Sequence, residues 1–268
     1  MTAMRRAAVL IRAYGTPIPA LPAQLEADAD GLREVLVRAI AESHPAYPGE
    51  IPDQSYSACR RFLSAFETIY TVNYDLLLYW AQMHEDTTIL THDDGFRTPE
   101  DGPAEYVTWD IEKTNSQSTF YLHGGLHFFD TGSSLVKYTW INTGVRLIDQ
   151  IRSALKGNLF PVFVSEGESD GKVARIRHSD FLSRSYRSFA NIGNTLFVYG
   201  HSFADNDEHI IRLIGRGKVR SLYVSIFGDP ASDDNQRIMR RAESLSAARR
   251  KNALKVAFFD AASAEVWG

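Results

Sequence analysis

Six short apolar runs, rich in β-branched and aromatic residues, constrain the fold of this chain more than any other feature. They cover residues 69–72, 119–122, 161–164, 195–199, 222–227 and 254–259. Runs of this length and composition predict strands, and strands that alternate with helices predict strand-helix-strand units and parallel pairing. We therefore expect an α/β fold with a mostly parallel sheet flanked by helices.

The segments between these runs, and the first 66 residues, have helical character. Connecting helices are expected over residues 75–84, 145–155, 209–214 and 235–246. In the first part, helical spacing is shown by Leu32, Val35, Leu36, Ala39 and Ile40, and by an amphipathic stretch over residues 56–66. The polar stretch 85–102 is expected to be a surface loop. We expect one domain, with a mostly helical portion over 1–66 and strand-helix repeats over 67–268.

Charge and cysteine content restrict the partners and the compartment. The net charge of -4 across 268 residues, with basic residues scattered, disfavours a nucleic-acid partner. Cys59 is the only cysteine, so it forms no internal disulfide and is expected to be a small core residue. No apolar run is long enough to span a bilayer and no signal peptide opens the sequence, so we expect a cytoplasmic protein without membrane contact. Homo-oligomerisation is left open.

Polar residues and glycines follow four of the expected strands, at the point where each run ends. In open parallel sheets, ligands bind outside the carboxyl ends of the strands. We therefore expect these residues to converge on one rim and to form the functional site. They are Asn73 and Asp75, then His123-Gly124-Gly125, then Gly200-His201-Ser202, and finally Gly228-Asp229.

The chemistry of this rim fits a sugar-phosphate ligand, because carboxylates and amides can hold ribose hydroxyls and glycines admit a phosphate. His123 is the expected general base, since an imidazole titrates near neutral pH. Asp75 has a second interpretation, as the cap of the helix that follows it. A histidine after a strand can likewise be structural, and glycine pairs can be ordinary turns.

Two further groups of polar residues are given structural interpretations. His123 and His127 have the spacing of a metal pair, but Gly124-Gly125 between them argues against the helix which that geometry needs. We therefore expect no metal. The polar run 205–209 precedes an apolar helical segment, as an ordinary helix start does.

Three motifs in the same order resemble those of the sirtuin-like superfamily. They are Thr71-Val72-Asn73-Tyr74-Asp75, Tyr121-Leu122-His123-Gly124 and Tyr199-Gly200-His201-Ser202. Together they span most of the chain. The sequence looks closest to a bacterial branch of unknown function, whose pattern includes Asn-Tyr-Asp-Leu-Leu-Leu-Tyr-Trp at 73–80 and Val-Ser-Glu-Gly at 164–167.

This resemblance implies a Rossmann-like fold that binds NAD and, in such bacterial relatives, cleaves the nicotinamide–ribose bond, often in anti-phage defence. By motif position, Asn73 and Asp75 face the nicotinamide ribose and His123 is the catalytic histidine. The residues expected to contact the dinucleotide are Thr71, Tyr74, Gly124, Gly200, His201, Ser202 and Gly228. A deacetylase with a four-cysteine zinc module is disfavoured, because the sequence has a single cysteine.

One departure from the family pattern concerns the phosphates of the dinucleotide. Sirtuin-like proteins begin with a strand and a glycine-rich loop, whereas residues 1–6 lead directly into helix. Either the sequence begins downstream of the usual start or this branch has lost that segment, and the edge of a neighbouring strand would then be exposed. Three functions follow as hypotheses: an NAD glycohydrolase, a non-enzymatic nucleotide-binding or interaction module, and a hydrolase of other N-glycosides.

Overall fold

The computed structural model describes residues 2–42, 44–84, 91–99, 106–138, 147–156, 159–164, 168–249 and 253–268. The chain divides into two compact units. The first contains residues 1–51 and 144–158, and the second contains residues 52–143 and 159–268. That the chain folds as one domain stays a prediction.

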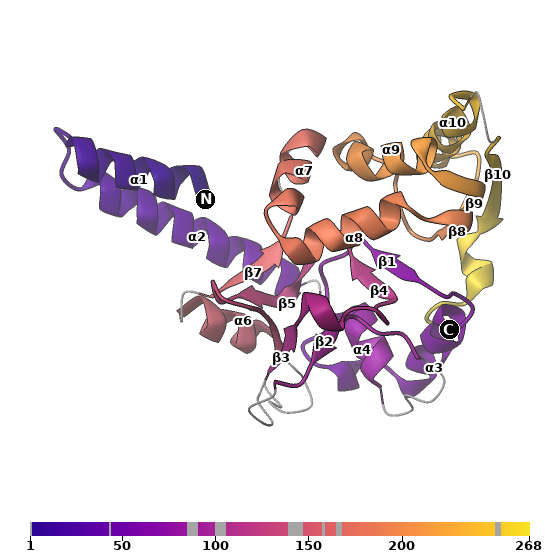
Figure 1. Cartoon of the computed structure of the whole chain (residues 1–268), viewed down its shortest axis with the longest axis horizontal. Helices are drawn as coiled ribbons and strands as arrows, with labels where there is room; N and C mark the ends of the chain where they lie inside the picture. The colour runs from indigo at the N-terminus through magenta and orange to yellow at the C-terminus, as the bar shows by residue number, and fades with distance from the viewer. Residues whose placement is uncertain are drawn as a thin grey trace. The chain divides into compact units, whose positions relative to one another are not determined.

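The first unit is helical, as the sequence predicts for its N-terminal part. It contains α1 (Thr2–Tyr14), α2 (Leu21–Glu42), a short 3-10 helix (Pro48–Glu50) and α6 (Leu147–Lys156). Helices α1 and α2 lie side by side (Figure 1), with Ala8 and Ala29 fully buried. Two ion pairs, Arg5–Asp30 and Arg12–Glu26, join them on the outside. Because both pairs are exposed, packing rather than charge holds these helices together.

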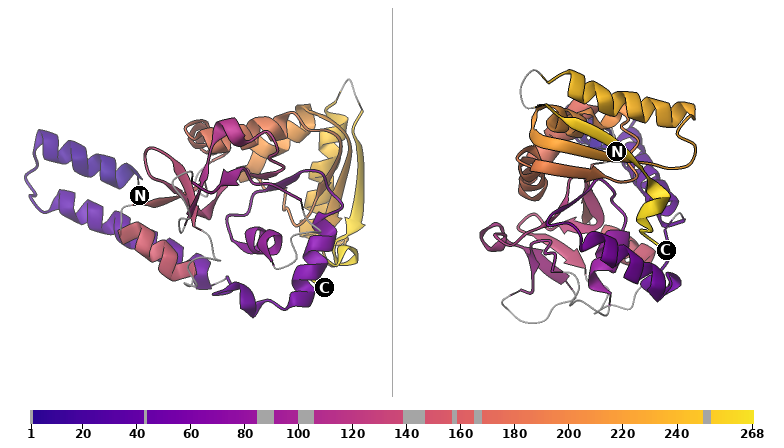
Figure 2. Two further views of the ribbon diagram at one scale, coloured as in Figure 1. Left: turned by 60° about the horizontal axis from the view of Figure 1, so that its bottom comes forward. Right: turned by 90° about the vertical axis from the view of Figure 1, so that its right-hand side faces the viewer.

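The second unit contains two groups of parallel strands. Strand β1 (Ile69–Thr71) pairs with β4 (Thr119–Tyr121). Strands β8 (Gly193–Val198), β9 (Lys218–Ile226) and β10 (Lys255–Asp260) form a parallel sheet in the order β10-β9-β8. Helix α10 (Asp233–Ala247) lies beside this sheet in both views of Figure 2. The sequence-predicted strands therefore form parallel pairs here.

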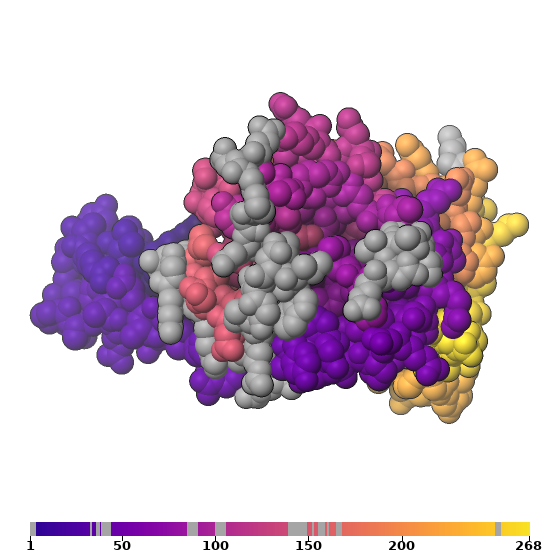
Figure 3. Space-filling model, turned by 90° about the horizontal axis from the view of Figure 1, so that it is seen from below, coloured from indigo at the N-terminus to yellow at the C-terminus, as the bar shows by residue number. Residues whose placement is uncertain are grey.

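Helices cover the parallel strands of the second unit. Helices α8 (Asp180–Ala190) and α9 (Glu208–Arg216) supply much of one apolar core. In this core Ile211 and Ile214 pack with Leu222 and Val224 of β9, and all four are at most 4% exposed. Helices α3 (Asp53–Leu63), α4 (Leu77–Met83) and α7 (Ser169–Arg177) complete the described α-helices of this unit. The C-terminal residues lie beside α3 (Figure 3), where Tyr56 and Trp267 are in edge contact.

The middle of the second unit departs from the predicted strand-helix repeats. Five strands form a sheet in the order β2-β3-β6-β5-β7, and every pair in it is antiparallel. These strands are β2 (Phe96–Arg97), β3 (Tyr106–Trp109), β5 (Gly124–Asp130), β6 (Leu135–Tyr138) and β7 (Phe160–Phe163). The expectation of a mostly parallel sheet is correct for β1, β4 and β8–β10, and wrong for these strands.

The physical reason is a hairpin that the sequence interpretation overlooked. Strands β5 and β6 are joined by a tight turn in which Gly132 adopts a φ of 86° and donates its N–H to the Asp130 carboxylate. A short connection of this kind returns the chain antiparallel to itself. Strand β7, which was expected among the parallel strands, pairs with the other edge of β5. Strand β2 lies in the predicted loop 85–102, of which residues 85–90 and 100–102 are outside the described part.

Candidate functional site

A pocket of about 1080 Å³ in the second unit runs along β1 and β8 and reaches their carboxyl ends. Thr71, Asn73 and Asp75, at the end of β1, line it. Gly200 and His201, which follow β8, line it as well. Five of the predicted site residues therefore line one cavity, together with residues along the whole of both strands. That they form a ligand site stays a prediction.

Asp75 has a local structural role in this pocket. Its Oδ1 accepts a hydrogen bond of 2.9 Å from the N–H of Leu77, the first residue of α4. Leu76 occupies the N-cap position, but the Asp75 carboxylate satisfies a free amide at the helix start, which is the role that the capping interpretation gives it. Asn73 is exposed, and its own N–H is bonded to the Thr71 hydroxyl at 3.0 Å.

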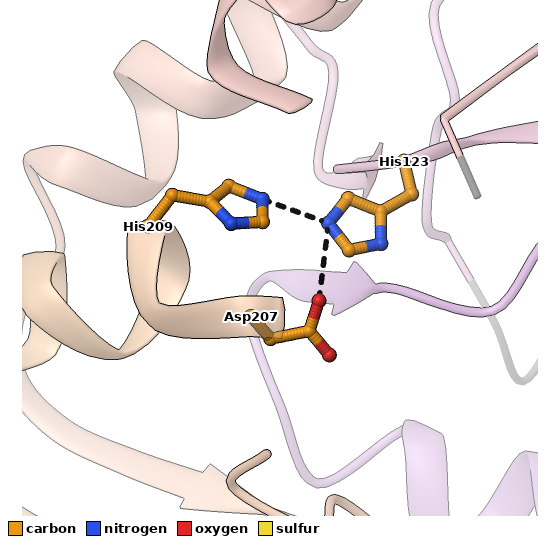
Figure 4. Close-up of side chains that lie close together, drawn as sticks. All are labelled: His123, Asp207 and His209. Carbon is orange, nitrogen blue, oxygen red and sulfur yellow. Dashed lines mark hydrogen bonds and ion pairs between the residues drawn. The ribbon is translucent and has the colours of Figure 1, made fainter. Parts of the chain in front are cut away.

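His123 lies in a group of polar side chains beneath the rim. It follows β4, is 4% exposed, and does not line the pocket. Its Nε2 is 3.0 Å from Nε2 of His209, so one imidazole donates a hydrogen to the other (Figure 4). The Asp207 Oδ1 atom lies 3.9 Å from the same His123 nitrogen. His123 comes from the segment after β4, whereas Asp207 and His209 come from the start of α9, which is distant in the sequence.

Asp207 connects this group to the pocket. Its Oδ1 accepts a 2.9 Å hydrogen bond from the buried ammonium of Lys172 in α7. Its Oδ2 lies 3.4 Å from Nε2 of His201, a pocket-lining residue. Because Nδ1 of His201 accepts the Phe203 N–H at 2.9 Å, Nε2 of a neutral His201 carries the proton that faces Asp207. We call His123, Lys172, His201, Asp207 and His209 the polar cluster.

The backbone next to His201 is held in an uncommon conformation. Phe203 has a φ of 53°, in the left-handed region that a bulky side chain rarely adopts. Its side chain is 4% exposed and packs with Leu122 and Ile210. Burial of this ring, together with the hydrogen bond to His201, keeps the strained residue in place. Strain of this kind is typical of functional sites.

Burial sets the protonation of the two histidines at the centre of the cluster. It lowers the pKa of His123 to about 4, although the Asp207 charge acts in the opposite direction. Burial likewise lowers the pKa of His209 to about 4. Burial opposes ionisation of Asp207, but the close contact with His201 and the hydrogen bond from Lys172 outweigh it and hold the pKa of this carboxyl below its usual range. At neutral pH His123 and His209 are therefore neutral and Asp207 is a carboxylate.

The polar cluster offers ligands that could hold a metal ion. One ligand atom each from His123, Asp207 and His209 lies within 4.8 Å of the others. A cation bound there would lie close to the Lys172 ammonium, which already neutralises Asp207, and it would have to break the His123–His209 hydrogen bond. Like-charge repulsion therefore disfavours a metal.

Acidification is expected to destabilise the protein through this histidine pair. Because each folded-state pKa of about 4 lies below the unfolded value, the unfolded chain binds more protons at mildly acidic pH. Stability is full above the unfolded pKa of about 6.5 and falls as the pH drops toward the folded value. We expect each of the two buried imidazoles to contribute about 2 kcal/mol to the loss between pH 7 and pH 5, because the unfolded chain protonates both.

Urea unfolding at the two pH values measures this loss. The variant His209→Gln should show a smaller difference between pH 7 and pH 5, because it removes one of the two buried imidazoles. The exposed His178 provides the matched control, and His178→Gln should leave the difference unchanged. An equal loss in wild type and His209→Gln would assign the acid sensitivity to other groups.

The remaining predicted cofactor contacts lie outside the pocket lining. Tyr74 is half-buried and its ring lies 5.7 Å from that of Phe163. Ser202 is exposed, and Gly228 follows β9 with a φ of 75°.

Gly124 begins β5 at a φ of 78°, where an added Cβ would lie 2.0 Å from the Val162 oxygen. Close strand pairing therefore explains this glycine. Of the motif at 164–167, residues 165–167 lie outside the described part.

Sequence reasoning missed Lys172, Asp207 and His209 as site residues. The run 205–209 does begin a helix, as predicted, but the Asp207 side chain makes no capping hydrogen bond there. It turns toward Lys172 and the histidines instead. A signal was available in His209, which occupies a buried position of the apolar face of α9 and is 3% exposed. A histidine among isoleucines on such a face needs a polar partner.

Comparison with known proteins identifies the family but no activity. The chain matches, over residues 2–267, the family described as a domain of unknown function (DUF4917), and it belongs to that family. A search of curated proteins found no match. Among the helices that the structure describes, none combines the length and apolar character needed to cross a membrane.

Proposed function

We propose that this member of the DUF4917 family binds NAD and hydrolyses the bond between nicotinamide and ribose. One observation carries the proposal: Asn73, Asp75, Gly200 and His201 line a single pocket where it reaches the carboxyl ends of β1 and β8. We propose further that β4-β1 and β8-β9-β10 are the two parts of a Rossmann-like sheet. The order of the three sirtuin-like motifs along the chain supports this assignment.

The proposed reaction uses the residues of the pocket and the polar cluster. The C1′–N bond breaks, and its electron pair neutralises the pyridinium of the departing nicotinamide. Water forms a new C1′–O bond and releases a proton. Asn73 and Asp75 hold the ribose hydroxyls, which orients C1′ toward the water. His123, neutral at pH 7 because burial lowers its pKa, is the proposed acceptor of the proton.

His201 completes the path between the pocket and His123. It is the residue of the polar cluster that lines the pocket, and it lies 3.4 Å from Asp207. Asp207 in turn lies 3.9 Å from His123. We propose that His201 and Asp207 orient the acceptor and stabilise the positive charge that it gains. Cytoplasmic location, a role in anti-phage defence and the absence of a nucleic-acid partner belong to the same proposal.

Incubation of the purified protein with NAD, followed by chromatography of nicotinamide, tests this function. The variant His123→Ala should lower the rate by about a hundredfold or more, because it removes the proposed base. His178→Ala, at an exposed histidine of α7's C-terminal end, is the control and should retain activity. A chelator should have no effect, since no metal takes part. No nicotinamide release together with no calorimetric binding at millimolar NAD would reject the proposal.

A binding module without turnover is the second candidate, and the burial of His123 favours it. This imidazole is 4% exposed and does not line the pocket, so a bound dinucleotide reaches it only through a rearrangement. Calorimetric binding of NAD without nicotinamide release would identify the protein as a nucleotide sensor of the same fold. Release of the base from other N-glycosides, without any from NAD, would instead identify a different hydrolase.

A further inference from the structure

Strands β1 and β8 each have one edge without a strand partner within the described residues. Strand β1 pairs with β4, and β8 pairs with β9, as the outer strand of its sheet. Alternate N–H and C=O groups of a parallel strand point to opposite sides, so each open edge presents main-chain hydrogen-bonding groups without strand partners. Both strands line the same pocket.

The open edges of both strands face into this pocket. Residues 65–73 line it without interruption, and so do residues 191–201. Successive side chains of a strand point to opposite faces, so a cavity lying on one face would be lined by alternate residues only. Continuous lining by both segments means that the cavity lies between the strand edges. We call this part of the pocket the strand slot.

Apolar residues close both faces of the strand slot. On one face, Leu196 and Val198 of β8 pack with the core that contains Ile211. On the other, the rings of Phe197 and Tyr199 lie 5.4 Å from Phe66 and 5.6 Å from Phe62, respectively. Phe62, Phe66 and Ile211 themselves line the pocket. A segment in the slot would therefore be covered by apolar groups above and below, as an interior strand of an α/β sheet is.

The carboxyl ends of the strands on either side of the slot lie close together. His123 follows the carboxyl end of β4, which is parallel to β1, and Asp207 follows that of β8. These two side chains lie 3.9 Å apart. The carboxyl ends of both groups of strands therefore meet at one rim. One further strand between β1 and β8 would join them into a continuous sheet.

The strand slot is large and incompletely covered. Its pocket has a volume of about 1080 Å³, at the upper end of the range of about 300–1,000 Å³ that is usual for small-molecule sites. Beside it, Phe197 and Tyr199 remain 44% and 42% exposed, whereas Leu222 and Val224 of the neighbouring β9 are at most 1% exposed. Strand-edge aromatic residues of this kind mark a surface that another chain covers.

We propose that the strand slot binds one extended peptide strand of a partner polypeptide, apolar on both faces, which completes the order β4-β1-strand-β8-β9-β10. The open main-chain groups of β1 and β8 supply the hydrogen bonds, and the apolar walls select a continuous apolar run without charged side chains. The occupied length matches β8, which has six residues. This interaction goes beyond the proposed NAD chemistry, which takes place at the rim above it.

Hydrogen exchange with a model peptide tests the proposal. The probe is a peptide of six consecutive valine and isoleucine residues between two pairs of lysines. Without the probe, amides in β1 and β8 should exchange faster than those in the interior strand β9. The probe should protect both β1 and β8, whereas a peptide with a central proline should not, because proline cannot donate to the ladder. The readout is independent of NAD turnover, so its failure and that of the proposed activity are distinguishable.

A matched pair of variants locates the binding site. Phe197→Lys places a charge at the slot edge and should weaken binding of the probe at least about tenfold. Phe227→Lys makes the same change at a residue that is 79% exposed and does not line the pocket, and should leave binding unchanged. Equal effects of the two variants, or protection of only one strand, would overturn the proposal. Protection of both strands before the probe is added would also overturn it, because the slot would then already be filled by the chain itself or by a second copy.

Discussion

Replacement of Asp207 by asparagine is expected to lower the free energy of unfolding by about 3 kcal/mol, the lower end of the range for breaking a buried ion pair. The Lys172 ammonium, which Asp207 neutralises at 2.9 Å, is 3% exposed. Asparagine can still accept the hydrogen bond from Lys172 but supplies no negative charge. The variant therefore leaves a buried cation without compensation. Urea unfolding at pH 7 measures the change.

The double variant Lys172→Met/Asp207→Asn separates this effect from a general loss of packing. It removes both charges, and replacement of a whole buried pair by groups of similar volume is often close to neutral. We expect the double variant to be more stable than Asp207→Asn. If the two single losses simply add, the pair does not interact, and the polar cluster is not held together by this contact.

Replacement of Gly124 by alanine is expected to destabilise the chain by about 3 kcal/mol, from left-handed backbone strain and overpacking together. The added Cβ would lie 2.0 Å from the Val162 oxygen and 2.9 Å from its carbonyl carbon. To remove this steric clash, β5 and β7 must separate where they pair at Gly124 and Phe163. Chemical unfolding measures the loss. A small loss with normal NAD binding would show that the two strands separate easily.

Gly132→Ala is the control that measures the cost of left-handed backbone strain alone. Gly132 also has a positive φ, of 86°, but an added Cβ there meets nothing within 4 Å. This variant should cost only the strain of about 1–2 kcal/mol. Equal losses at Gly124 and Gly132 would mean that the contact with Val162 contributes nothing. A larger loss at Gly124 than at Gly132 would show that close strand pairing requires the glycine at position 124. The predicted contact with a dinucleotide is then not needed to explain this residue.

Strand positions were readable in the sequence because local composition determines them. The run at 195–199 became β8 (Gly193–Val198), and that at 254–259 became β10 (Lys255–Asp260). β-Branched and aromatic side chains favour extended backbone whichever strand they pair with. Pairing itself is not local. Strand β7 was expected among the parallel strands but lies antiparallel to β5, which depends on the hairpin at Gly132.

Short or weakly patterned elements escaped prediction for a related reason. Helix α7 (Ser169–Arg177) has few apolar residues, so its period is faint, yet it delivers Lys172 to Asp207. Strand β2 (Phe96–Arg97) has two residues and exists only because β3 pairs with it. Contacts made elsewhere in the fold specify both elements, and no window of sequence contains those contacts.

The candidate site divides in the same way. The sequence by itself determined its rim, because Asn73, Asp75, Gly200 and His201 each follow an apolar strand and strand ends form ligand sites in open α/β sheets. Only the tertiary structure decided what lies beneath it. Lys172, Asp207 and His209 join His123 through contacts between residues as much as 86 positions apart, and the burial that lowers the histidine pKa values arises only when those segments pack together.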